Sequence, residues 1–319
     1  MSEQAKEPKA KTLSVFELMR RFPDEQAAID HFAGIIWQNG VYCPYCKGKN
    51  VTERKNRKNY YHCNPCNKDF TIRVGTVFHR SHISLDKWLF AMYFIVTDRM
   101  GISSVELAVK LGISQPAAWF LEMRIREMCG HQLDKLLSGI VETDESYFGG
   151  KEKNKHASKR LNQGRGTAGK TPVLGMRDRN GQVVAQVVNS TDAPTLQGII
   201  KQNVLKGSTI CTDEHKSYAG LASIAGKNYV HQTVNHSAGQ YVNGAFHTNS
   251  IESFWAVMKR GGYGVYIRNR GPHFNRYVDE FVFRQNEGNV KNDTEDRIEA
   301  LIRGAVGKRL TYKKLTRKI

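Results

Sequence analysis

The sequence has no apolar run that approaches the roughly 18 residues needed for a membrane-spanning helix. Its first residues, MSEQAKEPKAKTLS, also lack the apolar segment that characterises a secretory signal. We therefore expect a soluble, cytoplasmic protein that is not inserted in a membrane. The chain is expected to be complete, with a short polar tail before its first apolar segment.

Acidic residues are scarce relative to basic ones. The chain has 30 Asp and Glu against 48 Lys and Arg, which gives a formal net charge of +18 and a pI of about 9.6. Such an excess indicates a polyanionic partner, most commonly nucleic acid, with an anionic membrane surface as the alternative. The length of 319 residues suits two or three domains better than a single core.

Cysteine is also rare, yet four of the six cysteines form two CxxC pairs separated by sixteen residues. In a basic protein without a secretory signal, such pairs are typical of metal ligands; a redox dithiol is the alternative. Four thiolates hold a tetrahedral zinc ion and leave no open coordination position. We therefore predict a structural zinc ribbon over residues 41–72, with a basic hairpin facing DNA and with these ligands: Cys43, Cys46, Cys63 and Cys66.

Residues 84–130 have the apolar spacing of helices, with Ser84 as a candidate cap. Gly112 is expected to end one helix, and Pro116 lies in the first turn of the next. Two helices joined by such a turn form a helix-turn-helix, whose second helix, beginning near Gln115, can enter a DNA major groove. A helical hairpin that only packs has the same pattern. The predicted buried side of the first helix comprises Val105, Leu107, Ala108 and Leu111.

From about residue 137, short strand-like runs alternate with turns and helices, and two of these runs end in acids. VETDES ends near Asp144, and ICTDEH ends near Asp213. An unpaired carboxylate is unfavourable at the end of a buried strand, whereas converging carboxylates bind Mg²⁺. The spacing leaves Glu142 and Glu145 as alternatives to Asp144, and Glu214 as an alternative to Asp213.

The segment FHTNSIESFWAVMKRGGYGVYI predicts a helix that carries Glu252 and Lys259 on nearly the same stripe. A surface salt bridge is the ordinary explanation for this pair. As a functional pair, Glu252 would complete the carboxylate site and Lys259 would contact the DNA backbone, with Asn249 as an alternative ligand. Two metal ions held by such carboxylates activate a water or a 3′-hydroxyl for attack on a phosphodiester.

The order of these motifs closely resembles that of the bacterial insertion-sequence transposases of the IS1595, or ISXO2-like, family. The resemblance runs from about residue 20 to about residue 290. It rests on the CxxC pairs, the helix-turn-helix pattern, VETDESYFGGK, CTDEHKSY, HTNSIESFWAVMKRGGYGVYI and GPHFNRYVDEFVFRQN. It implies a DDE catalytic domain with a ribonuclease-H-like fold behind an N-terminal zinc ribbon.

By this likeness, Asp144 and Asp213 match the two aspartates, Glu252 matches the third acid, and Lys259 matches the lysine seven residues later. Some members have asparagine as the third residue. Because glutamate stands here at the correct spacing from the lysine, the sequence resembles the fully acidic version and Asn249 is disfavoured.

The predicted fold class is multidomain α+β. The expected domains are a disordered tail over 1–20, an N-terminal helix plus zinc ribbon over 21–78, a helix-turn-helix segment over 79–135, a ribonuclease-H-like mixed α/β catalytic domain over 136–290, and a basic C-terminal tail over 291–319.

The resulting hypothesis is a DNA transposase that binds terminal inverted repeats and carries out strand cleavage and strand transfer. Its expected cofactors are structural Zn²⁺ and catalytic Mg²⁺ or Mn²⁺. Its expected partners are double-stranded DNA, as element ends and target, and further copies of itself, at the bacterial nucleoid. A non-catalytic DNA-binding regulator and a nuclease that cuts without joining are the alternatives. The residues predicted to contact DNA are Lys151, Lys216, Arg260 and Gln115.

Overall fold

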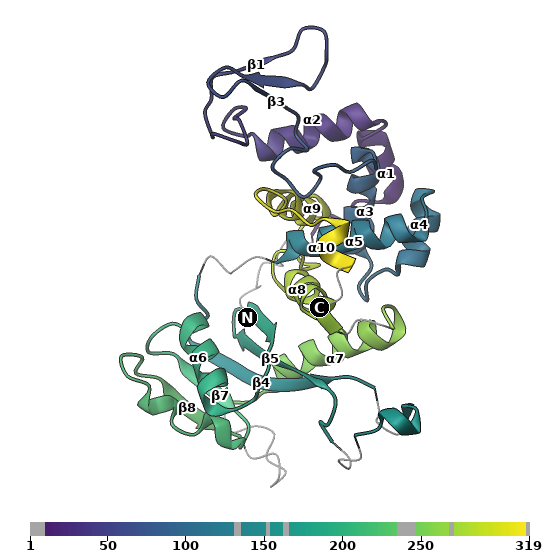
Figure 1. Cartoon of the computed structure of the whole chain (residues 1–319). Helices are drawn as coiled ribbons and strands as arrows, with labels where there is room; N and C mark the ends of the chain where they lie inside the picture. Colours follow the sequence, from purple (N-terminus) through teal and green to yellow (C-terminus); the bar gives the residue numbers. More distant parts are fainter. Residues whose placement is uncertain are drawn as a thin grey trace, which may run out of the picture. The chain divides into compact units, whose positions relative to one another are not determined.

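The computed structural model describes residues 10–130, 135–150, 154–161, 166–234, 246–267 and 271–316 (Figure 1). The chain divides into two compact units. The first comprises Met1–His131 and Glu287–Ile319, and the second comprises Gln132–Asn286. Within the described residues, no helix is long and apolar enough to cross a bilayer.

The first unit contains a small antiparallel sheet in the order β1-β2-β3, formed by Val51–Glu53, Tyr61–Cys63 and Lys68–Phe70. Its core is only a few side chains deep. Trp37 meets Tyr61 edge-on at a ring-centroid distance of 5.1 Å, and Phe70 stacks on Tyr61 at 5.7 Å. A core this small rarely supports a fold without a disulfide or a metal ion.

The remainder of the first unit is helical. The central helix α3 buries most of its surface, including Trp88 and Met92, because α2, α4, α5 and α9 all pack against it. Two of these helices begin at side chains that commonly cap a helix. Asp24 accepts from the N–H of Ala27 in α2, and Ser103 accepts from the N–H of Glu106 in α4. The helices are α1 (Val15–Arg21), α2 (Glu25–Ile36), α3 (Leu85–Thr97), α4 (Ser104–Leu111), α5 (Gln115–Cys129), α9 (Thr294–Arg303) and α10 (Tyr312–Thr316).

Two segments expected to be tails contain helices. Within 1–20, α1 begins at a capping box in which Ser14 and Glu17 bond each other's backbone N–H groups. Within 291–319, α9 buries an apolar stripe that includes Ile298 and Leu301, and its first residue, Thr294, is also buried. Because the other side of α9 carries many charged residues, the overall composition of this segment did not indicate an apolar stripe. The expected disordered tail and basic tail therefore do not describe residues 15–20 and 294–316, which contain these helices.

The second unit is built on a five-stranded sheet in the order β6-β5-β4-β7-β8. β5 is antiparallel to both of its neighbours, whereas β7 is parallel to β4, and β8 is parallel to β7. Figure 1 shows β4 between β5 and β7. The strands are β4 (Ile140–Phe148), β5 (Thr171–Asp178), β6 (Val183–Val187), β7 (Thr209–Thr212) and β8 (Val230–Thr233).

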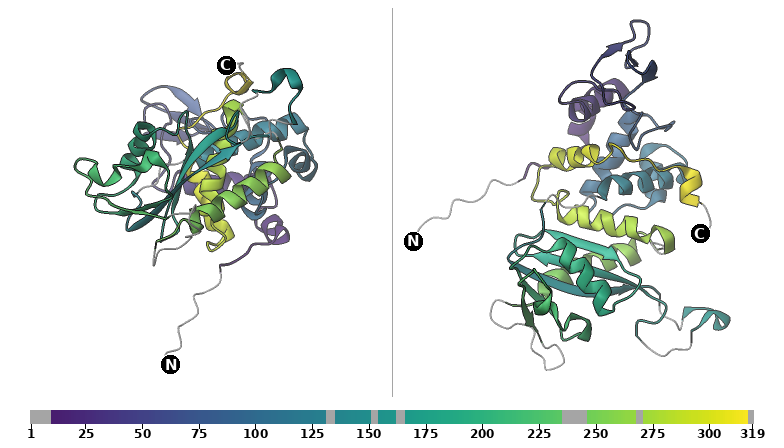
Figure 2. Two further views of the ribbon diagram at one scale, coloured as in Figure 1. Left: turned by 90° about the horizontal axis from the view of Figure 1, so that it is seen from below. Right: turned by 60° about the vertical axis from the view of Figure 1, so that its left-hand side comes forward.

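Helices cover both faces of this sheet (Figure 2). On one face, α6 (Ala193–Asn203) packs Leu196 and Ile200 against Val141 and other strand side chains. On the other face lie α7 (Asn249–Gly264) and α8 (Phe274–Gln285). Side chains alternate along a strand. The odd-numbered residues of β4, such as Val141, therefore face α6, and the even-numbered residues face α7.

Candidate metal centres and catalytic carboxylates

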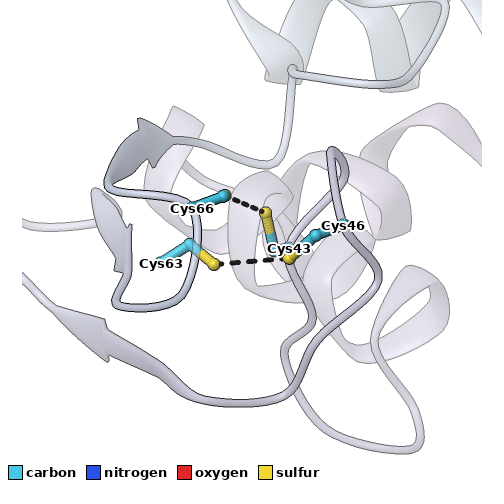
Figure 3. Close-up of side chains that lie close together, drawn as sticks. All are labelled: Cys43, Cys46, Cys63 and Cys66. Carbon is cyan, nitrogen blue, oxygen red and sulfur yellow. Dashed lines mark hydrogen bonds between the residues drawn. The ribbon is translucent and has the colours of Figure 1, made fainter.

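The four predicted zinc ligands converge in the first unit (Figure 3). All four Sγ atoms lie within 4.8 Å of one another. The Sγ–Sγ distance is 3.5 Å both for Cys43 with Cys66 and for Cys46 with Cys63. A tetrahedral zinc ion with Zn–S bonds of about 2.3 Å sets its sulfur ligands roughly 3.8 Å apart, so these cysteines fit zinc.

The backbone explains why the thiols point inward. Lys47 and Asn67 each directly follow the second cysteine of a pair, and both adopt left-handed conformations, with φ of 63° and 50°. In the first turn, the N–H of Lys47 donates to the carbonyl of Cys43 at 2.9 Å. The two CxxC segments therefore make similar tight turns, and β2 places Cys63 opposite the first turn. The other two cysteines, Cys129 and Cys211, are buried and lie outside this cluster.

The second candidate site lies where β4 and β7 run side by side. In their parallel register, Glu142 is opposite Cys211. Two residues further along each chain come Asp144 and Asp213, so the two lie at the same level along the strands. Asp213 directly follows the end of β7. The expected strand end near Asp144 is wrong, because β4 continues to Phe148 in its pairing with β5. The charge of Asp213 contributes to the raised pKa of Asp144, as expected for a nearby carboxylate.

Burial is the main reason why the pKa of Asp144 is raised to about 7, and the charges of Glu145 and Asp213 add to this effect. A hydrogen bond from Trp255 Nε1 to Asp144 Oδ2, at 3.0 Å, acts in the opposite direction. Burial likewise raises the pKa of Glu145 to about 7. Glu145, at an odd-numbered position of β4, points to the face that α6 covers. Asp144 is thus a partly buried carboxyl whose charged form a divalent cation would stabilise.

Helix α7 lies along β4 on the face that carries Asp144. Trp255, which bonds Asp144, stands three residues after Glu252 and four before Lys259, so these three side chains share one helical stripe. The Lys259 ammonium lies 5.8 Å from the ring centroid of Phe148 on β4. Glu252 and Lys259 therefore lie on either side of the point where α7 contacts the first aspartate.

Glu252 itself is exposed, and its carboxylate accepts a hydrogen bond from the Thr248 hydroxyl at 2.8 Å. Among the described residues, only the four cysteines form a group of three or more candidate ligands within 4.8 Å of one another. Asp144, Asp213 and Glu252 therefore do not form a tight ligand cage in the described part of the chain. Within the same residues, Lys259 makes its cation–π contact with Phe148 and no ion pair with Glu252.

The other predicted contact residues are less informative. Lys216 and Arg260 are exposed, on the 3-10 turn after Asp213 and on α7 respectively. Gln115 is the first residue of α5, and its Nε2 donates to the Ser104 hydroxyl at 2.8 Å. Lys151 lies outside the described residues.

Val105, expected on the buried side of α4, is 63% exposed, because its position on the helix faces away from α3 and α5.

Two features of the site were not anticipated. One is the direct contact of Trp255 with Asp144, because the sequence indicated only that Trp255 is buried. The other is Glu142, which was weighed as a rival ligand but is fully buried against the first turn of α7. The contact of Trp255 with Asp144 could have been anticipated from the ESFW spacing, which puts Trp255 on the same helical stripe as Glu252.

Gly175 on β5 leaves the space that Trp255 occupies. A Cβ at this position would lie 2.4 Å from Trp255 Cζ2 and 2.9 Å from Ile251 Cδ1. We expect Gly175→Ala to destabilise the protein by about 1–3 kcal/mol, since the indole must move off Asp144. Urea denaturation measures this loss. Gly198→Ala in α6, where nothing lies within 4 Å, is the matched control and should be neutral or stabilising.

Two known family models match the segments of the chain that form the zinc ribbon and the carboxylate-bearing sheet. A family model described as the ISXO2-like transposase domain matches residues 136–286. A second one, described as the transposase zinc-ribbon domain, matches residues 23–69. The two matches define the chain as a transposase with an N-terminal zinc ribbon.

The two matches together span more than half of the chain, and the chain belongs to the ISXO2-like family of insertion-sequence transposases, as its motifs predicted. It is also similar to a protein in the transposable element ISH50 of Halobacterium salinarum. The two are 28% identical over 253 residues, which cover 76% of this chain and 84% of the relative.

Proposed function

We propose that this transposase binds the terminal inverted repeats of its element and catalyses metal-dependent DNA strand cleavage and strand transfer. The observation that carries the proposal is the position of Asp144, in the middle of β4, at the level of Asp213, which directly follows the parallel neighbour β7. The position of Glu252, on the stripe of α7 that contacts Asp144, supports its role as the third acid of the site.

The sheet supports a ribonuclease-H-like assignment for the second unit. Three strands form a meander in which only the middle one, β5, runs opposite to the rest of the sheet. A helix, α6, then leads to β7, which returns beside the first strand. This topology explains why Asp144 and Asp213, 69 residues apart in the sequence, come from neighbouring strands.

Asp144, Asp213 and Glu252 would hold Mg²⁺ or Mn²⁺, which supplies activation of the attacking oxygen and stabilisation of the leaving oxygen when bound. In the cleavage step, water attacks the phosphodiester at the element end and releases a 3′-hydroxyl. In the transfer step, that hydroxyl bonds to a target phosphorus and the target 3′-oxygen leaves. Lys259, with Lys216, Arg260 and Lys151, is proposed to contact the DNA phosphates.

The surface proposed to recognise the terminal repeats belongs to the first unit. α4 and α5 are joined through Gly112, which adopts φ of 59° and ends α4, and this geometry supports a helix-turn-helix. Gln115 at the start of α5 would then meet base edges, and the basic zinc ribbon would contact phosphates. We further propose that the protein acts as a homo-oligomer, because both element ends must be joined in one complex.

Duplex binding is expected to depend steeply on salt. If six to ten phosphates are contacted, raising salt from 50 to 200 mM should weaken binding about 10³- to 10⁵-fold, because each contact releases counterions. Fluorescence anisotropy with a labelled duplex measures this slope. An affinity that is unchanged across this range would contradict binding through Lys and Arg.

A nicking assay tests the proposed function. Purified protein is incubated with Mg²⁺ and a labelled duplex that carries an element end, beside Asp213→Ala and the matched control Glu214→Ala, which removes an exposed neighbouring acid. We expect the wild type and the control to nick at the element end and Asp213→Ala to bind without nicking. Binding without nicking by all three proteins would favour the non-catalytic regulator.

A further inference from the structure

We infer that Glu142 is a positioning residue, which fixes α7, and with it Glu252, against the strand that carries Asp144. The inference rests on the proposed function of the carboxylate site and assigns Glu142 a role distinct from metal binding. Glu142 precedes Asp144 by two residues on β4, so both side chains point to the face that α7 covers.

The carboxylate of Glu142 is surrounded by donors. Its Oε2 accepts from the backbone N–H groups of Ser250 and Ile251, at 2.8 and 3.0 Å. Its Oε1 lies 3.3 Å from His247 Nδ1 and accepts from the guanidinium of Arg179. The residue is only 1% exposed. With both oxygens occupied in this way, Glu142 has little capacity left to bind a metal ion.

This contact replaces the usual helix cap. The side chain of Thr248, the N-cap residue of α7, makes no capping bond to a backbone N–H of the helix, and its hydroxyl donates to the Glu252 carboxylate. Two orphan N–H groups of the first turn, with their partial positive charge, are satisfied by a carboxylate from β4. A further hydrogen bond connects the sheet to the first turn of α7: Arg177 on β5 donates to the carbonyl of Ser250 at 2.9 Å.

The anchor lies close to the acid that it would position. α7 contacts β4 at Ser250, through Glu142, and again at Trp255, through Asp144. These contacts are five residues apart on the helix, about 7.5 Å, and two residues apart on the strand, about 6.6 Å, so helix and strand run alongside each other in register. Glu252 lies between the two contacts. The helix therefore cannot slide or turn without breaking one of them.

The variant Glu142→Gln in the full chain tests this role. Glutamine keeps the shape, but its NH₂ group must face a donor, so one anchor bond is lost. We expect at least about tenfold faster amide hydrogen exchange over residues 249–256. Mn²⁺ affinity and the rate of cleavage should each fall about 10- to 100-fold, as is typical when a residue that orients a ligand is changed, while DNA affinity stays unchanged.

A double variant shows whether Glu142 acts through Glu252. Adding Glu142→Gln to Glu252→Gln should reduce Mn²⁺ affinity by less than about twofold further, since the acid being positioned is already absent. Glu280→Gln is the matched control. It removes a buried, arginine-paired carboxylate on α8, and should lower stability while leaving Mn²⁺ affinity unchanged.

Three results would overturn the inference. Exchange could remain slow in Glu142→Gln, or exchange could rise while Mn²⁺ affinity and cleavage stay at the wild-type level. The losses could also be equally large with and without Glu252. A failure of the proposed function is distinguishable, because the wild type itself would then neither bind Mn²⁺ nor cleave; this result would overturn the positioning role as well.

Discussion

Replacing Asp144 with asparagine is expected to stabilise the metal-free protein above pH 7 while abolishing strand cleavage. Burial, with the charges of Glu145 and Asp213, raises the pKa of Asp144 to about 7 in the folded state. The unfolded carboxyl titrates near its ordinary value, about 3.9. Between these values the folded state binds more protons than the unfolded state, so the free energy of unfolding falls as pH rises through this window.

Asparagine has no charge to bury and keeps an oxygen that can accept from Trp255 Nε1. Its stabilising effect should be absent near pH 4, grow toward pH 7, and level off above it at about 4 kcal/mol. Thermal denaturation of both proteins with a chelator at pH 4.5 and pH 8 measures the difference. The account would be contradicted if the asparagine variant were less stable than the wild type at pH 8.

The same variant should cleave at least about a thousandfold more slowly in Mg²⁺, because metal-assisted charge stabilisation contributes several kcal/mol to such reactions. DNA affinity should remain within about twofold of the wild-type value. Glu214→Gln is the control for a general effect of removing an acid near Asp213, and it should retain activity. Undiminished cleavage by Asp144→Asn would show that another acid binds the metal.

Zinc removal is expected to unfold residues 41–72. The sulfur atoms of Cys43, Cys46, Cys63 and Cys66 lie close together in a core with few apolar side chains. Apparent zinc-binding energies of about 10–16 kcal/mol in such sites are folding energy, so chelation or Cys63→Ser should remove the local fold. Hydrogen exchange should become fast over this segment and stay slow in the five-stranded sheet, and DNA affinity should fall.

The matched control for zinc removal is Cys129→Ala. It removes a buried cysteine of α5 that is no part of the cluster, so the zinc content should remain near one ion per chain. Equal thermal stability and equal exchange over 41–72 with and without a chelator would contradict a structural zinc site.

The sequence predicted those parts of the molecule whose signals are local. A CxxC pair contains two ligands and the turn between them within four residues, so the four zinc ligands could be predicted from the spacing. The strand end before Asp213 and the end of α4 at Gly112 are likewise short-range features. The strand end expected near Asp144 was wrong, because pairing with β5 extends β4 to Phe148. Because parallel neighbours cannot be read from local pattern, the family resemblance supplied the expectation that these two aspartates meet.

The features that the sequence did not reveal depend on long-range packing. Glu142 and Ser250 are 108 residues apart, and nothing near Glu142 indicates that its carboxylate caps a distant helix. The fit of Trp255 against Gly175 is of the same kind. In α9, a charged composition hid an apolar stripe of only a few residues, whose burial depends on α2, α3 and α5.

A joining assay with pre-cleaved ends tests whether Asp144 and Asp213 form a site for strand transfer. A labelled element end with a free 3′-hydroxyl is mixed with target duplex, Mg²⁺ and either the wild type or Asp213→Ala. We expect covalently joined products from the wild type and none from the variant, with equal DNA binding by both proteins. Joined products from Asp213→Ala, or none from a DNA-bound wild type in Mg²⁺ or Mn²⁺, would contradict such a site.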